Sequence, residues 1–140
     1  KTHMVNIERL KVSSVQYEDN VQFGKKNMLD DNMESCWSSD DKETQWILIK
    51  LEKKTKVESI EMTFQGGFSP KLMEVWVGDK PKTLEKHKTC YPKDTTAKQT
   101  FDITTNEPVR VIKLISTKSY DFYGRIMIYK IAVNEKKEDE

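Results

Sequence analysis

The stretch Trp46-Ile-Leu-Ile-Lys-Leu51, followed by Val57-Glu-Ser-Ile-Glu-Met-Thr-Phe64, decides the fold. In both segments an apolar residue recurs at every second position: Ile47, Ile49, Leu51, Ile60, Met62 and Phe64. Side chains of a β-strand point to opposite faces in turn, so this period gives each segment one apolar face. The pattern therefore predicts two strands, each with one side turned toward a core.

The same period of two recurs along most of the chain. Strands are expected at residues 10–15, 46–51, 57–64, 73–77, 86–91, 99–103, 109–116 and 125–133. In the last segment the inward set is expected to be Met127, Tyr129, Ile131 and Val133. Residues 27–35 are the best candidate for a short helix. About eight short strands separated by turn signals predict an all-β fold, an antiparallel β-sandwich of the jelly-roll type. Trp37 and Trp46 are expected to be its buried anchors.

Length and charge narrow the class of protein. The chain has 140 residues and carries 24 Lys+Arg against 23 Asp+Glu, a formal net charge of +1. This length suits one domain, expected over residues 5–134, with residues 135–140 as a disordered charged tail. Balanced charge argues against direct binding to nucleic acid, and no apolar run is long enough to span a membrane.

The sequence offers no catalytic motif. The two histidines, His3 and His87, have no Ser or Cys nucleophile in a recognisable setting, and neither a zinc-protease motif nor a P-loop is present. We therefore expect no enzyme and no organic cofactor. Cys36 and Cys90 are too few for a disulfide scaffold, so we expect two free thiols in an intracellular protein, with one bridge as the alternative.

Acidic residues cluster in Leu29-Asp-Asp-Asn-Met-Glu34. Their spacing matches the start of an EF-hand loop, but Ser35 and Asp41 stand where that loop needs Gly and Glu, so an EF-hand is excluded. Two interpretations of Asp30 remain. The one we favour is that Asp30 ties down the loop by accepting backbone N–H bonds. The other is that Asp30 and nearby carbonyls hold a structural calcium ion.

Three segments place aromatic residues beside glycine at strand boundaries: Gln22-Phe-Gly-Lys-Lys26, Phe64-Gln-Gly-Gly-Phe68 and Tyr120-Asp-Phe-Tyr-Gly-Arg125. Loops of a sandwich gather at its two ends, where they carry binding. We expect these segments to form one recognition surface with seven contact residues: Phe23, Lys25, Lys26, Gln65, Phe68, Tyr123 and Arg125. Such rings and charges suit a polar or anionic partner. The alternative is that the rings only close the open end of the core.

The chain resembles the discoidin domain, also called the coagulation factor V/VIII type C domain. The resemblance is carried by Leu29-Asp-Asp-Asn-Met-Glu-Ser-Cys-Trp37, Gln45-Trp-Ile-Leu-Ile-Lys-Leu51 and Gly124-Arg-Ile-Met-Ile-Tyr129, and it covers about residues 10–134. It implies a galactose-binding-like jelly roll. Within that superfamily, Gln22-Phe-Gly-Lys-Lys-Asn27 and Phe64-Gln-Gly-Gly-Phe-Ser69 are similar to the testicular receptor 4-associated protein family. That similarity implies a non-catalytic adaptor that binds a protein in nucleus or cytoplasm, a nuclear receptor-associated repressor of transcription.

The chain also departs from the discoidin pattern. Many relatives hold calcium between the acidic loop and a Glu in the closing strand, but Lys130 replaces that acid here. Lipid-binding members carry exposed Trp or Leu on the loop that corresponds to residues 17–26, where this chain has polar residues around Tyr17, Val21 and Phe23, so no membrane insertion is expected. Two further functions remain open. One is a carbohydrate-binding module that uses Gln65 and Arg125. The other is a subunit of a larger assembly, as in intraflagellar transport or a ubiquitin ligase.

Overall fold

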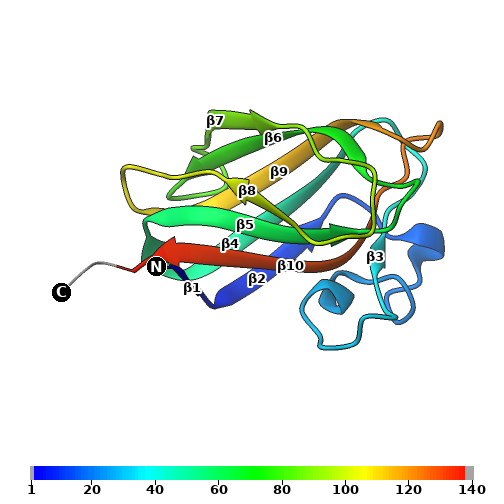
Figure 1. Ribbon diagram of the computed structural model, residues 1–140, viewed down its shortest axis with the longest axis horizontal. Helices are drawn as coiled ribbons and strands as arrows, with labels where there is room; N and C mark the ends of the chain where they lie inside the picture. The colour runs from blue at the N-terminus through cyan, green and yellow to red at the C-terminus, as the bar shows by residue number, and fades with distance from the viewer. Residues whose placement is uncertain (1, 138–140) are drawn as a thin grey trace.

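The computed structural model describes residues 2–137 and contains two antiparallel β-sheets that lie face to face (Figure 1). One sheet has the order β1-β10-β5-β8, with β3 also paired to β10, and the other has the order β2-β4-β9-β6-β7. The elements are β1 (Thr2–Met4), β2 (Ile7–Val12), the 3₁₀ helices η1 (Gln16–Glu18) and η2 (Lys25–Met28), β3 (Trp37–Ser38), β4 (Gln45–Thr55), β5 (Val57–Phe64), β6 (Pro70–Gly78), β7 (Glu85–Cys90), β8 (Gln99–Asp102), β9 (Val109–Ser119) and β10 (Met127–Lys136). The predicted all-β jelly-roll sandwich is confirmed.

The core lies between the sheets and is filled by the alternating residues of the opening stretch. The inward side chains of β4 and β5 are all buried: Ile47, Ile49, Leu51, Ile60, Met62 and Phe64. Each of the eight expected strands overlaps a strand of the structure, although β2 begins and ends earlier than expected. Two short strands, β1 and β3, were not predicted, because two or three residues are too few to show a period.

The two tryptophans expected in the core have different environments. Trp37 is 1% exposed, and its Nε1 donates to the carbonyl oxygen of Ser14 at 2.9 Å. Trp46 is half-buried on the outer face of its sheet, where the ammonium of Lys113 lies 4.8 Å from the ring centroid. The expectation of a buried Trp46 is wrong because its neighbour Ile47 occupies the inward position, and adjacent residues of a strand face opposite ways.

The alternation of inward and outward residues in β10 changes part-way along the strand. Ile131 and Val133 are buried as expected, but before them Ile128 is buried while Met127 and Tyr129 are only half-buried. The register with β5 shifts between Ile128 and Lys130, and such a bulge moves the alternation by one residue. The expected inward positions of Met127 and Tyr129 are therefore wrong, although the strand itself was predicted.

The start and end of the described chain pair with each other. In β1 and β10, Thr2 is opposite Lys136, His3 is opposite Glu135 and Met4 is opposite Asn134. The paired strands reach beyond residues 5 and 134, the boundaries expected from the sequence. Backbone hydrogen bonds form this pairing, and a charged side-chain pattern does not reveal them. Residues 138–140 of the expected tail lie outside the described residues.

Candidate functional site

Three loops lie at the end of the sandwich away from β1 and the end of β10 (Figure 1). They connect β2 to β3, β5 to β6, and β9 to β10, and we call them the rim. Backbone bonds join them. Ser38 N donates to Phe23 O at 3.1 Å and Ser38 pairs with Met127. Met127 N then donates to Phe68 O at 3.2 Å. The three glycine-flanked segments thus meet at one end.

The seven expected contact residues all lie at or beside the rim, but their exposure differs. Lys26 and Tyr123 are exposed. The other five are half-buried: Phe23, Lys25, Gln65, Phe68 and Arg125. Gln65 Oε1 accepts a bond from the Tyr129 hydroxyl at 3.1 Å, and within residues 2–137 the buried Nη1 of Arg125 has no hydrogen-bond partner. Of the seven, therefore, Lys26 and Tyr123 are the two side chains most open to a partner.

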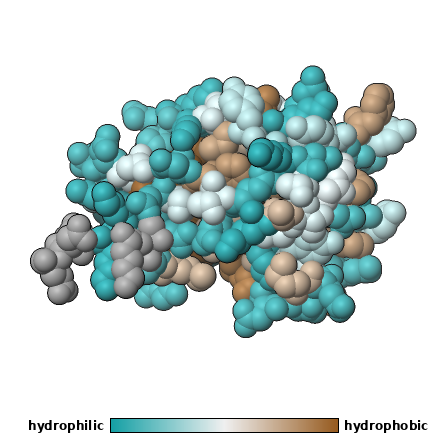
Figure 2. Space-filling view, viewed as in Figure 1, coloured by the Kyte–Doolittle hydropathy of each residue, from teal (hydrophilic) through white to brown (hydrophobic). Residues whose placement is uncertain are grey.

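The seven expected contact residues do not include the most exposed apolar side chains of the rim. Phe122 is 92% exposed, Val21 is 91% exposed and Tyr17 is 80% exposed. The Phe122 and Tyr123 rings meet edge to face with centroids 5.2 Å apart, and Figure 2 shows hydrophobic atoms clear of the body at the upper right, where Figure 1 places the β9–β10 loop. The signal was present, because two adjacent rings in a tight loop cannot both face the core.

The β9–β10 loop is braced from below. Gly124 has a φ of +92°, and a Cβ added there would lie 2.2 Å from the carbonyl oxygen of Lys42. The β3–β4 loop is therefore in direct contact with the turn that carries Phe122 and Tyr123. Beside the turn lies a hollow of about 480 Å³, and one of its lining residues, Lys71, has its ammonium 5.4 Å from the Tyr120 ring centroid. Aromatic and basic groups thus share one concave surface.

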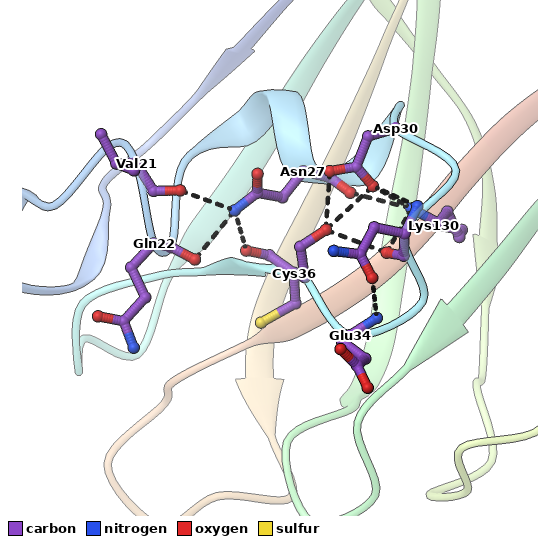
Figure 3. A network of polar contacts seen from close by, with 9 residues as sticks. Val21, Gln22, Asn27, Asp30, Glu34, Cys36 and Lys130 are labelled. Atoms are coloured by element: carbon purple, nitrogen blue, oxygen red, sulfur yellow. Dashed lines mark hydrogen bonds and ion pairs between the residues drawn. The ribbon is translucent and has the colours of Figure 1, made fainter.

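The acidic loop is closed by hydrogen bonds to Asp30 (Figure 3). Asp30 Oδ1 accepts from Lys130 Nζ at 2.5 Å and from Asn32 N at 3.1 Å, and Ser35 Oγ lies 2.7 Å from Oδ2. Asp30 thus accepts one backbone N–H bond, of the kind that the loop-tying interpretation expects, and further bonds from two side chains. A helix over residues 27–35 is wrong beyond Met28, because side-chain oxygens of Asp30 and Asn32 take the backbone N–H groups two residues on.

The surroundings of Asp30 do not fit a calcium ion. Besides Asp30, the Lys130 ammonium reaches the carbonyl oxygens of Asn32 at 3.0 Å and Asn27 at 3.3 Å, so a cation already lies among these oxygens. Within residues 2–137, no three His, Cys, Asp or Glu side chains are grouped so that they could hold a metal ion.

The two cysteines are buried free thiols, as expected. Burial raises the pKa of Cys36 and of Cys90, which lowers the fraction of reactive thiolate near neutral pH. The described part of the chain also contains no helix that is long and apolar enough to cross a bilayer.

The chain matches known proteins over nearly all of its length. The family model described as a NedA-like, galactose-binding domain matches residues 27–114. A nuclear receptor 2C2-associated protein from Danio rerio is 38% identical over 133 residues, which are 95% of this chain and 94% of the relative. The chain belongs to the nuclear receptor 2C2-associated protein family. The resemblance seen in the sequence is thereby confirmed.

Solved structures agree with this family on the fold. An F5/8 type C domain from Bacteroides fragilis has a TM-score of 0.83 at 15% identity and covers 98% of both chains. A family 32 carbohydrate-binding module from C. perfringens, solved in complex with galactose, has a TM-score of 0.73 at 18% identity and covers 91% of this chain and 93% of that one. At these identities the likeness shows the fold alone.

Replacing Asp30 by Asn is expected to lower the free energy of unfolding at neutral pH, because Lys130 loses its charged acceptor. The hydrogen bond from Lys130, followed by that from Ser35, lowers the pKa of Asp30 from its ordinary 3.8. The ionised Asp30 therefore stabilises the folded chain fully at pH values above 3.8. This stabilisation is lost as the pH falls through the lowered pKa. Urea unfolding of both proteins should show a difference at neutral pH that shrinks in acid.

The neighbouring exposed residue Asp31 provides the matched control. The substitution Asp31→Asn should leave unfolding close to that of the wild-type chain at every pH. A difference between wild type and Asp30→Asn that stays constant into strong acid would contradict the role assigned to the Asp30 carboxylate.

Proposed function

We propose that the chain is a non-catalytic adaptor that binds a protein partner through the rim, with Lys26, Phe122 and Tyr123 among its contacts. The observation that supports this most is the exposure of Phe122 at 92% and of Tyr123 at 68% on a braced turn. Aromatic side chains held in water at one end of a rigid frame are typical of interface hot spots. The other expected contact residues are half-buried and would then pack beneath the exposed ones: Phe23, Lys25, Gln65, Phe68 and Arg125.

The partner we propose is a nuclear receptor of the 2C2 type. The relative that is 38% identical is named for association with such a receptor. In this proposal the chain acts as a repressor of transcription in the nucleus or cytoplasm. Two buried, unbridged cysteines support a reducing compartment, because paired cysteines are the rule in oxidising ones.

The double substitution Phe122→Ser with Tyr123→Ser is expected to weaken binding to purified nuclear receptor 2C2 strongly. Truncation of an interface hot spot costs at least ~2 kcal/mol, which is roughly a thirtyfold loss of affinity. Because both rings are exposed, the thermal unfolding transition should stay where it is. Calorimetric titration measures the first quantity and circular dichroism measures the second.

A matched control lies at the opposite end of the sandwich. Met4 is an exposed apolar residue of β1, and Met4→Ser should leave receptor binding unchanged. Wild-type binding by the double variant would rule out the Phe122–Tyr123 turn as the contact. Absence of binding by the wild-type chain would rule out this receptor as the partner.

A carbohydrate is a second candidate ligand, favoured by the hollow of about 480 Å³ between Tyr120, Tyr123 and Lys71. A ring face beside a few polar groups is the usual arrangement in a small-molecule site. The sequence assigned sugar contacts to Gln65 and Arg125, but both are half-buried and neither lines this hollow. A glycan array without hits at millimolar sugar would dispose of this candidate.

A further inference from the structure

Lys130 lies on β10, far in sequence from the acidic loop, yet its ammonium contacts lie in that loop and in η2 just before it. Its Nζ donates to Asp30 Oδ1, to the Asn32 carbonyl at 3.0 Å and to the Asn27 carbonyl at 3.3 Å. An ammonium group has three N–H donors, so these acceptors use all of them. Only 22% of the Lys130 side chain is exposed, which leaves the charge little contact with water.

The oxygens around Lys130 are of the kind that a hard cation selects. Carboxylate and main-chain carbonyl oxygens are common calcium ligands in proteins. Here the Asp30 carboxylate and the carbonyls of Asn27 and Asn32 converge on one point, and their partial negative charges would repel one another without a cation between them. The Lys130 ammonium supplies one positive charge against the single negative charge of Asp30.

The same loop is also connected to the rim segment that carries Phe23. Asn27, whose carbonyl faces Lys130, uses its side-chain amide to donate to the carbonyls of Gln22 at 2.9 Å and Cys36 at 3.0 Å (Figure 3). Gln22 precedes Phe23 of the rim, and Cys36 precedes β3. Asn27 therefore links the cation site directly to the backbone that carries Phe23.

We propose that the Lys130 ammonium is the permanent cation of this loop and takes the place that a metal ion would need among these oxygens. The chain then needs no calcium to order residues 22–36 of the rim. The oxygen cage remains a latent calcium site, which opens when the ammonium is exchanged for a carboxylate. In Lys130→Glu, two carboxylates and the two carbonyls would face one another, and their charge would match that of a calcium ion.

The test compares thermal unfolding in a calcium chelator with unfolding in millimolar calcium chloride. The wild-type chain should unfold at the same temperature in both. Lys130→Glu should unfold at a lower temperature than wild type in chelator and recover in calcium, and isothermal titration should detect calcium binding that the wild-type chain lacks.

Lys54→Glu is the matched control. Lys54 pairs with Asp79 at 3.3 Å and both side chains are 57% exposed, so this variant also places two carboxylates together but away from the carbonyls that face Lys130. It should show no comparable response to calcium. An equal response in both glutamate variants would overturn the proposal, as would stabilisation of the wild-type chain by calcium.

A neutral variant keeps the test decisive if Lys130→Glu does not fold. Lys130→Met retains the aliphatic stem and removes the charge, so amide hydrogen exchange of residues 27–36 should become faster than in wild type. Lys54→Met should leave exchange in that loop unchanged. Unchanged exchange in Lys130→Met would show that the ammonium does not hold the loop.

Discussion

Truncation of Trp37 to Ala is expected to remove about 3–5 kcal/mol from the free energy of unfolding. Trp37 is 1% exposed and belongs to the core cluster between the sheets. The substitution leaves a large cavity and deprives the Ser14 carbonyl of the indole N–H bond at 2.9 Å. Because a domain is stable by only ~5–15 kcal/mol, the variant should unfold at much lower urea concentration.

Trp46→Ala is the control for this prediction. Its ring lies on the outer face of the sheet under Lys113, and a cation–π contact at an exposed site contributes about 0.5–1 kcal/mol. The loss should therefore be several times smaller than for Trp37. Far-ultraviolet circular dichroism should follow the urea titrations, since both substitutions remove a fluorophore. Equal losses for the two variants would contradict the assignment of Trp46 to the outer face.

Gly124→Ala is expected to cost about 3 kcal/mol, the upper end of the range for strained backbone. Two effects add at this position. The φ of +92° is unfavourable for any residue with a Cβ, and that Cβ would lie 2.2 Å from the Lys42 carbonyl oxygen and 2.5 Å from its carbon. Either the β3–β4 loop or the turn bearing Phe122 and Tyr123 must move, so partner binding should weaken as well.

Gly67→Ala separates the two effects. Gly67 has nearly the same φ, +93°, but a Cβ there would meet no atom within 4 Å. Its cost should be that of the left-handed backbone alone, about 1–2 kcal/mol. Urea unfolding measures the loss of unfolding free energy in each variant. The loss in Gly124→Ala minus the loss in Gly67→Ala is the cost of the clash at Gly124. Equal losses of unfolding free energy in Gly67→Ala and Gly124→Ala would show that the contact with Lys42 adds nothing to the cost.

Features of the fold that depend on neighbouring residues could be predicted from sequence. The alternation in β4 and β5 assigned Ile49 and Phe64 to the core correctly, because it is a local property of a strand. The bulge after Ile128 could not be predicted in this way, since it is a register shift against β5, a strand distant in sequence. Trp46 was misplaced for a different reason. Its size suggested burial, whereas the alternation of its own strand already pointed it outward.

In the candidate site, too, local features could be predicted from sequence and features that depend on distant residues could not. Glycine and aromatic residues at strand ends indicated which segments gather at one end, because sandwich loops have few places to go. Contacts between loops decide which side chains are exposed to solvent and which are packed beneath them. For this reason Phe122 was missed as a contact residue, and Arg125 was expected to be more exposed than it is. The departure at Lys130 was visible in the sequence, but its three acceptors were not.

Because Lys130 lies on the final described strand, it is synthesised after the three loops of the rim. The loop that contains Asp30 leaves the ribosome 100 residues before the lysine that closes it. At roughly 5–20 residues per second, the interval is on the order of 5–20 s. During that time the loop lacks the ammonium of Lys130, and β3 and β5 have no β10 to pair with. The rim is thus completed last, and a chain released before β10 could not display it.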